Sequence, residues 1–445
     1  MAASGLLEQL DRRGMIEQIT NRGALEELLA KPKASIYVGF DPTADSLHVG
    51  HLLPVLMLAR FQHAGHRPIV LVGGATGMIG DPSGKSDERQ LLTPEMVARN
   101  ADAIRRQLSR FVAFEGETAA SIVDNGDWIR PIRYLDWLRD VGKHFTINYM
   151  LGKESVRRRL EDRDHGISYT EFSYMLLQAY DFLHLHDTFE CKIQAGGSDQ
   201  WGNITAGIEL IRKARGEEAF GVTFPLLSTS SGEKFGKSAG NAVWLDPAKT
   251  SPYQFYQFWV RTDDRDVERL LKLFTFLDLE EIEGLCSVHR AKPDDRLAQK
   301  RLAAEITRVV HGTDSVALAL KASEALFGGD VAGLSDKDML DIFADVPSFS
   351  VQVSVLEQGI KIVDALVLSG VAKSKGEASR LIQGGGVYLN NLRVEGVERC
   401  IRRHDLASES MFVLRVGKKS YSLGRVTGTG EPIQQARPGV DSSTT

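Results

Sequence analysis

Two histidines flank a glycine in His48-Val49-Gly50-His51, where an apolar strand expected over 35–40 gives way to a helix expected over 52–61. Pro54 fits that helix, because the first helical turn tolerates proline. A helix N-terminus binds anions through its unpaired N–H groups and its positive dipole end, and Gly50 lets a ligand approach the backbone. A lone histidine is more often structural, but this pair at the start of a helix indicates a nucleotidyl-transfer site.

Two further segments carry cations in glycine-rich loops. The loop that contains Lys234-Phe235-Gly236-Lys237-Ser238 is rich in small residues and places two lysines three residues apart. The loop over 73–89 follows an apolar strand and includes Asp81, Lys85 and Arg89. Such lysines are usually ordinary surface residues when they occur alone, but beside the histidine motif they suggest mobile phosphate ligands.

A helix expected over 171–186 is apolar nearly all round, which is typical of a buried helix. Tyr174, Gln178 and Asp181 nevertheless fall on one stripe of it, at i, i+4 and i+7. These groups could satisfy neighbouring backbone, or they could line a pocket for a small polar ligand. We favour the pocket, because an unpaired carboxylate in the interior is costly and three polar residues share one face.

The order of elements predicts an α/β fold. Apolar strands expected over 35–40, 68–72, 121–124 and 191–195 alternate with helices, and this βαβαβ order predicts a Rossmann-like, doubly wound parallel sheet. Ligands bind beyond the carboxyl ends of such strands. The polar glycine turn Gly196–Asn203, with Asp199 and Gln200, is one of the loops that leave those ends.

With 445 residues the chain exceeds one ordinary domain. We expect a Rossmann-like catalytic domain over 1–248, a helical domain over 249–343, a linker over 344–358, a small α+β domain over 359–426 and a disordered tail over 427–445. Net charge is −5, yet residues 355–425 hold 12 Lys and Arg against 7 Asp and Glu, a balance of +5. A basic module on an acidic body suggests that the module meets a polyanion.

The composition also bears on the compartment. Cys191, Cys286 and Cys400 are far apart and form no CxxC motif, which suits a reducing cytosol and predicts neither structural zinc nor disulfides. The N-terminus resembles neither a signal peptide nor a transit peptide. No run of about 18 apolar residues is present. We therefore expect a cytoplasmic protein with no membrane partner.

In chain order these motifs resemble those of class I aminoacyl-tRNA synthetases, most closely the bacterial tyrosyl branch. The resemblance rests on Tyr37-x-Gly39-x-Asp41, His48-x-Gly50-His51, the Asp81 loop, Tyr174-x-x-x-Gln178-x-x-Asp181, Gly197-Ser198-Asp199-Gln200-Trp201-Gly202 and Lys234-Phe235-Gly236-Lys237-Ser238. It covers essentially the whole chain, because residues 359–426 resemble the ribosomal-protein-S-four-like RNA-binding domain of those enzymes. Val49 replaces a frequent isoleucine, and Phe235-Gly236 is a variant usual in the tyrosyl branch.

The resemblance implies a role for each motif residue. The implied catalytic residues, which bind phosphates, are His48, His51, Lys234, Lys237, Lys85 and Arg89. For tyrosine, Tyr37 and Asp181 meet the phenol hydroxyl, Gln200 lies beside the carboxylate, and the α-ammonium is held by Tyr174, Gln178 and Asp81. The implied ATP-binding residues are Gly39, Asp41, Gly50, Asp199, Lys237 and Ser238.

The implied reaction is the activation of L-tyrosine with ATP, followed by transfer of the tyrosyl group to the 3′-terminal ribose of tRNA(Tyr). No acidic cluster stands out as a metal cage, so Mg²⁺ is expected to arrive with ATP. The family also implies a homodimer, with the helical domain on the anticodon side. Three alternatives remain at this point: a tryptophanyl-tRNA synthetase, a non-tRNA adenylyltransferase, and a synthetase-derived RNA-binding or splicing factor.

Overall fold

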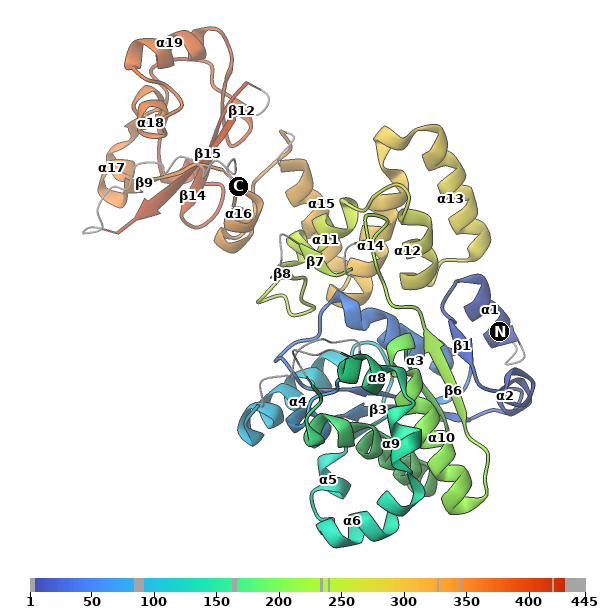
Figure 1. The fold of residues 1–445 in the computed structure, drawn as a ribbon. Coiled ribbons are helices and arrows are strands. Elements are labelled where there is room, and N and C mark those ends of the chain that lie inside the picture. The colour runs from blue at the N-terminus through green and yellow to red at the C-terminus, as the bar shows by residue number, and fades with distance from the viewer. Residues whose placement is uncertain are drawn as a thin grey trace. The chain divides into compact units, whose positions relative to one another are not determined.

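The computed structural model describes residues 5–83, 92–161, 166–232, 235–238, 241–325, 328–344, 346–417 and 420–428. The chain forms two compact units, one of Met1–Lys249 with Phe258–Val310 and one of Thr250–Gln257 with His311–Thr445 (Figure 1). Among the helices that can be described, none has the length and apolar character needed to cross a membrane. Most of the tail expected to be disordered, from residue 429 onward, lies outside the described residues.

The first unit is built on a six-stranded sheet with the order β1-β6-β5-β2-β3-β4. Its five parallel strands are β2 (Ser35–Phe40), β3 (Arg67–Val72), β4 (Ser121–Asp124), β5 (Cys191–Gly197) and β6 (Phe220–Phe224). β1 (Gln18–Ile19) pairs antiparallel with β6 at the edge, a strand that the sequence did not predict. The chain runs outward from β2 in both directions, which confirms the doubly wound α/β fold and makes the β2–β5 junction the topological switch point.

Local signals place the helices that flank this sheet. Thr93 caps α4 (Pro94–Leu108) through a bond from the Met96 N–H, with Pro94 at its first position. Ser168 and Glu171 form the capping box of α9 (Tyr169–Phe189), which lies beside α10 (Trp201–Arg215) (Figure 1). The other helices before residue 249 are α1 (Leu6–Arg12), α2 (Arg22–Leu29), α3 (Leu52–His63), α5 (Gly126–Ile129), α6 (Tyr134–Asp140), α7 (Ile147–Leu151) and α8 (Glu154–Glu161).

Helices dominate residues 252–342. They are α11 (Pro252–Val260), α12 (Val267–Phe274), α13 (Leu279–Ala291), α14 (Leu297–His311), α15 (Thr313–Ala325) and α16 (Asp336–Ile342). The predicted boundaries of a separate helical domain, 249–343, do not coincide with the compact units. The first unit contains α12 and α13, whereas α15 and α16 belong to the second.

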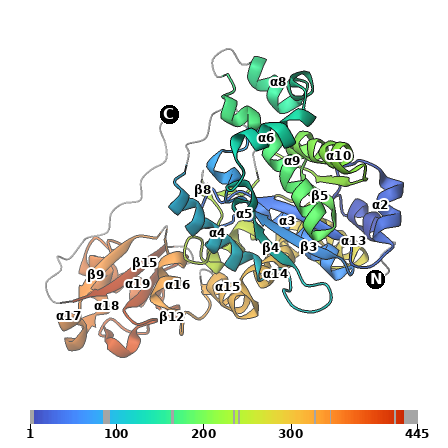
Figure 2. The same cartoon turned by 90° about the horizontal axis from the view of Figure 1, so that it is seen from below.

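The second unit contains a five-stranded sheet with the order β12-β11-β14-β15-β9. Its strands are β9 (Ser348–Gln352), β11 (Val387–Leu389), β12 (Leu392–Arg393), β14 (Met411–Val416) and β15 (Ser420–Thr427). A separate strand pair joins β10 (Ile360–Lys361) to β13 (Cys400–Ile401). Figure 2 shows β9 beside β15 in the same part of the fold as α17 (Val353–Gln358), α18 (Ile362–Leu368) and α19 (Lys375–Gln383).

The expectation of a linker over 344–358 is wrong, because this segment carries β9 and α17. β9 adds to the sheet as a parallel partner of β15, with Phe349 and Val351 buried in the core. A second apolar cluster joins Met339 and Phe343 of the preceding segment to Val413 of β14. The C-terminal sheet therefore shares a core with residues before 344.

Candidate active site

The parallel strands bring most of the predicted motif residues to one edge of the sheet. Asp41 follows β2, the glycine loop beginning at Gly73 follows β3, and Asn125 follows β4. Asp199 and Gln200 lie in the 3₁₀ turn η5 (Ser198–Gln200) directly after β5. The carboxyl ends of parallel strands meet at the same edge, so loops far apart in sequence converge there.

The histidine motif forms the 3₁₀ turn η2 (Val49–His51) at the start of α3. His48 Nδ1 accepts a bond from the Gly50 N–H at 3.1 Å, and His51 Nδ1 accepts one from the His48 N–H at 3.2 Å. An Nδ1 that accepts a bond carries no proton, so both rings are neutral with the proton on Nε2. A Cβ on Gly50 would lie 2.8 Å from the His48 ring. A side chain at position 50 would thus displace the His48 ring, which is a reason for glycine other than the predicted approach of a ligand.

The lysine-bearing loop lies against this turn. An added Cβ on Gly236, whose φ is +96°, would lie 2.9 Å from Val49 Cγ2 and 3.4 Å from the Gly50 nitrogen. Val243 bonds both motifs. Its carbonyl accepts the Val49 N–H at 2.9 Å, and its own N–H donates to the Gly236 carbonyl. The two motifs are therefore neighbours in the first unit, as the resemblance requires.

Phe235 of the same loop packs into an aromatic cluster. The Phe235 ring centroid is 5.6 Å from that of Phe258, 5.5 Å from Trp259 and 5.8 Å from Phe274. Lys237 and Ser238 form the short strand β7, of which only the backbone is described. Three predicted phosphate ligands, Lys85, Arg89 and Lys234, lie outside the described residues.

Asp181 and Tyr37 are buried polar side chains that interact in an otherwise apolar part of the first unit. Asp181 Oδ2 accepts the Asn125 side-chain N–H at 2.9 Å, and Oδ1 accepts the Trp128 indole N–H at 2.8 Å. Burial raises the pKa of Asp181 to about 8 against the opposing effect of these two donors. Burial, and next the Asp181 charge, raise the pKa of Tyr37 well above its usual value, so its hydroxyl stays protonated.

The Tyr37 hydroxyl is fully buried and has no hydrogen-bond partner within the described residues. Its ring packs against Phe182 with centroids 5.3 Å apart. A buried donor without a partner carries a desolvation penalty of about 1–3 kcal/mol, and a ligand with a suitable acceptor removes it. Tyr37 and Asp181 therefore offer a hydroxyl donor and a carboxylate acceptor to a group that binds beside them.

A second polar cluster lies between the Asp81 loop and α10. Asp81 Oδ2 accepts the Gln200 side-chain N–H at 2.6 Å. The Asn203 amide donates to Gln178 Oε1 at 3.0 Å and to Gln200 Oε1 at 3.2 Å. The structure thus brings three of the predicted residues together, with a carboxylate and two amide oxygens in one network.

Tyr174 joins this region to the end of β2. Its hydroxyl donates to Asp41 Oδ2 at 2.9 Å, and the Thr76 hydroxyl donates to Asp41 Oδ1 at 2.8 Å. Burial and then Asp41 raise the pKa of Tyr174 well above its usual value. The protonated hydroxyl gives its hydrogen to Asp41, so its oxygen remains an acceptor.

The sequence did not single out Asn125, Trp128, Thr76 and Asn203, although all four contact predicted site residues. Asn125 is fully buried, and its amide also donates to Thr76 Oγ1 at 3.0 Å. A usable signal existed for it, because it directly follows β4 at the same strand edge as the other motifs. Trp128 offered no such signal, since its contact with Asp181 joins segments that are far apart in the sequence.

No group of three or more His, Cys, Asp or Glu side chains is placed to hold a metal ion in the described part of the chain. The fold and the site instead define a class I tRNA synthetase. The family model described as tRNA synthetases class I (W and Y) matches residues 29–328. The model described as the tyrosine–tRNA ligase SYY-like C-terminal domain matches residues 338–424.

The chain belongs to the tyrosine–tRNA ligase family. It is 54% identical over 402 residues to the tyrosine–tRNA ligase of Roseiflexus castenholzii, covering 90% of this chain and 95% of that one. It is 52% identical to the Geobacillus stearothermophilus enzyme, covering 94% and 99%. The crystal structure of a C-terminally truncated Aspergillus nidulans mitochondrial tyrosyl-tRNA synthetase matches with a TM-score of 0.66 and 33% identity, covering 72% of this chain and 94% of that chain.

Proposed function

We propose that this protein activates L-tyrosine with ATP and then transfers the tyrosyl group to tRNA(Tyr). The observation that carries the choice of amino acid is that the Tyr37 hydroxyl has no hydrogen-bond partner within the described residues and interacts electrostatically with the Asp181 carboxylate. A phenol hydroxyl donates to Asp181 and accepts from Tyr37. An indole has one N–H donor and no acceptor, so tryptophan leaves Tyr37 unpaired, and phenylalanine bonds neither Tyr37 nor Asp181.

The remaining polar groups suit the two ends of an amino acid. The Asp81 carboxylate, the Gln178 amide oxygen and the Tyr174 hydroxyl oxygen are acceptors for the α-ammonium, while Gln200 lies beside the carboxylate. Gly39 is the one exposed residue of β2, and an added Cβ there would meet only Leu71, at 3.7 Å. The space over Gly39 is thus left open for a ligand, which supports its role in the ATP site with Asp41, Gly50, Asp199, Lys237 and Ser238.

In the first step a tyrosine carboxylate oxygen attacks the α-phosphorus of ATP, and the bond to the β-phosphate oxygen breaks to release pyrophosphate. The carboxylate is already ionised, so no general base is needed, and catalysis consists of positioning and charge stabilisation. The Nε2–H groups of His48 and His51 are the proposed donors to the phosphates. Lys85, Arg89, Lys234 and Lys237 complete the proposed set, and Mg²⁺ enters as part of the nucleotide substrate.

In the second step a hydroxyl of the 3′-terminal ribose attacks the tyrosyl carbonyl, and AMP leaves. The C-terminal module is the proposed tRNA contact. Its charge balance of +5 over residues 355–425 supports this role. We place the reaction in the cytoplasm, where the three cysteines remain unpaired thiols.

The assignment is tested by exchange of labelled pyrophosphate into ATP. We expect exchange with L-tyrosine and none above background with L-tryptophan or L-phenylalanine. Exchange driven by tryptophan would favour the sister enzyme. Failure with all three amino acids would leave the non-tRNA adenylyltransferase and the RNA-binding or splicing factor.

The histidine turn gives a prediction on catalysis. Replacing His48 with alanine removes a phosphate donor that acts in the transition state, so kcat for activation should fall about 10²- to 10³-fold. KM for ATP and for tyrosine should stay within about 2-fold, since the contact is made in the transition state alone. Stopped-flow measurement of adenylate formation gives both quantities. His63→Ala, at the exposed end of the same helix, is the control, and a KM effect as large as the kcat effect would contradict the assignment.

A homodimer is proposed from the apolar surface of residues 134–169. Seven large apolar side chains of this segment are exposed: Tyr134, Leu135, Leu138, Ile147, Leu151, Leu160 and Tyr169. Leu135 is 76% exposed, and the Tyr134 and Tyr169 hydroxyls lie 3.3 Å apart, which joins α6 to the start of α9. Apolar surface of this kind marks protein interfaces.

Leu135→Asp should therefore convert a dimer to a monomer in sedimentation velocity at micromolar concentration, because a buried unpaired charge costs several kcal/mol at an interface. Leu392→Asp, an equally exposed leucine in the C-terminal sheet, is the control that should leave the mass unchanged. A wild-type protein that sediments as a monomer would refute the homodimer.

A further inference from the structure

His184 and Trp128 form a stacked pair behind Asp181. Their ring centroids are 4.3 Å apart and the planes differ by 17°. His184 lies three residues after Asp181 on α9, and the indole N–H of Trp128 donates to Asp181 Oδ1 at 2.8 Å. The His184 imidazole thus stacks on the Trp128 indole, and the N–H of that indole bonds the Asp181 carboxylate.

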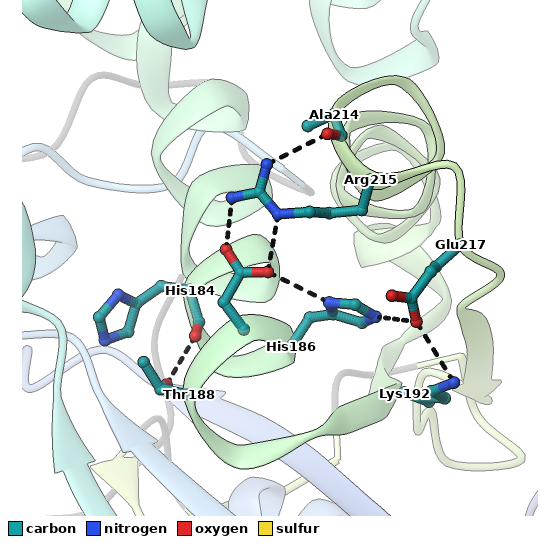
Figure 3. A network of polar contacts seen from close by, with 8 residues as sticks. His184, His186, Thr188, Lys192, Ala214, Arg215 and Glu217 are labelled. Carbon is teal, nitrogen blue, oxygen red and sulfur yellow. Dashed lines mark hydrogen bonds and ion pairs between the residues drawn. The ribbon is translucent and has the colours of Figure 1, made fainter.

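The stack belongs to one side of α9 only. Figure 3 shows the His184 and His186 imidazoles on opposite sides of this helix. His186 Nδ1 lies 3.4 Å from Asp187 and its Nε2 3.3 Å from Glu217, in a network that includes Arg215 and Lys192. His184 therefore contacts the Trp128 side chain beside Asp181, whereas His186 belongs to the charge network at the end of the helix.

The two donors to Asp181 are held in different ways. The Asn125 amide also bonds Thr76, and its oxygen accepts the Ala75 N–H at 2.7 Å, so three bonds fix this buried side chain. Trp128 lies on the four-residue helix α5 and is half-buried. One side of the pair opens to a hollow of about 440 Å³, lined also by Arg105, Asp124, Asp127 and Phe189.

Trp128 packs against the core cluster of the first unit, but the hollow leaves space beside the indole. The flat face of His184 supplies the missing support. The Tyr180 ring also neighbours the imidazole, with its centroid 6.4 Å from that of His184. A stacked aromatic pair favours one relative orientation of its planes, which is the property needed to keep an N–H directed at a carboxylate.

We propose that His184 is a positioning residue for tyrosine recognition, which holds the Trp128 indole N–H on Asp181 and so directs the carboxylate to the phenol hydroxyl. This role rests on the proposed function. Without the stack the indole turns into the hollow, and Asp181 keeps one donor where it had two. The carboxylate then leaves the orientation that its two donors set, and tyrosine binds less well while ATP is unaffected.

The test is steady-state pyrophosphate exchange with four variants of the full-length protein. His184→Ala and His184→Leu should each raise KM for tyrosine about 3- to 10-fold, with kcat and KM for ATP within about 2-fold of wild type. His184→Phe, which keeps a flat ring, should restore KM to within about 2-fold. His186→Ala should leave KM for tyrosine unchanged while lowering the thermal midpoint.

A double-mutant cycle separates positioning from general destabilisation. Trp128→Phe removes the N–H and should raise KM for tyrosine by itself, and adding His184→Leu should raise it no further, since both act through one bond. Additive effects, equal changes in both KM values, or a phenylalanine variant no better than leucine would overturn the proposal. Wild-type exchange with tyrosine keeps this outcome distinct from a failure of the proposed function, which would abolish exchange in every protein.

Discussion

Replacing Asp181 with asparagine is expected to abolish most of the discrimination between tyrosine and phenylalanine. Sites that hydrogen-bond a substrate hydroxyl reject the analogue that lacks it by about 10⁴- to 10⁵-fold, a range for which tyrosyl-tRNA synthetases are themselves the standard example. In the variant one carboxylate oxygen becomes an NH₂ group that cannot accept the phenol hydrogen. It also faces the Asn125 amide, which donates to Asp181 at 2.9 Å in the native pocket.

The loss of a charge-assisted bond together with a misplaced donor amounts to about 3–4 kcal/mol, or about 10²- to 10³-fold in kcat/KM for tyrosine. Phenylalanine makes neither bond, so its kcat/KM should not fall. Discrimination is measured as the ratio of the two kcat/KM values in pyrophosphate exchange. Asp187→Asn is the matched control, because Asp187 lies on the same helix and pairs with Arg215 away from the pocket. A ratio unchanged in Asp181→Asn would show that this carboxylate is structural.

The same carboxylate should give tyrosine binding a pH dependence that the variant lacks. Burial raises the pKa of Asp181 to about 8, so the group is largely protonated at neutral pH in the free protein. A phenol hydroxyl bonds the ionised form more strongly, so binding lowers this pKa and releases a proton. KM for tyrosine should therefore fall as the pH rises from 6 to 8. The profile of Asp181→Asn should be flat across this window.

The sequence predicted those elements whose local signals agree with their burial. The strand expected over 35–40 is present with these bounds, because its apolar run ends at the turn that begins with Asp41. β1 was missed, since a two-residue edge strand has no periodicity to detect. β9 was missed because residues 344–358 were expected to form a linker, whereas the strand exists only through its pairing with β15.

The residues of the candidate site could likewise be predicted only in part from the sequence. Asp181 and Gln178 were predicted because polar residues on a buried helix must have partners. The sequence could not show that Trp128 and Asn125 are the partners of Asp181, since these contacts join segments more than fifty residues apart. Gly50 was expected to admit a ligand, and the displacement of the His48 ring by a side chain at position 50 became visible only when the imidazole was placed above it.

The second large effect is expected from removing the C-terminal module, and the structure determines where to cut. A deletion of 344–445, which the predicted linker would suggest, exposes Met339 and Phe343 by removing Val413 and Leu423 from their shared core. It also leaves Asp336 without the Ser410 hydroxyl, which donates to it at 2.6 Å. Each large apolar side chain so exposed costs about 1.5–3 kcal/mol, so this variant should aggregate.

A deletion of 329–445 removes α16 together with the sheet and retains α15, whose buried side chains are mainly alanines. The bond from Gln257 to Ser323, at 2.7 Å, still ties α15 to α11. We expect this shorter chain to exchange pyrophosphate with tyrosine within about 3-fold of the full-length protein, since the proposed activation site lies wholly in the first unit.

The same deletion should lower tRNA charging by about 10³-fold or more, because phosphate contacts from a basic surface supply most of the affinity for a nucleic acid. Charging is measured with labelled tyrosine at two salt concentrations. In the full-length protein the rate at subsaturating tRNA should fall steeply with salt, and the residual activity of the deletion should depend on salt much less. Charging that survives the deletion with its salt dependence intact would place the main tRNA contact outside residues 329–445.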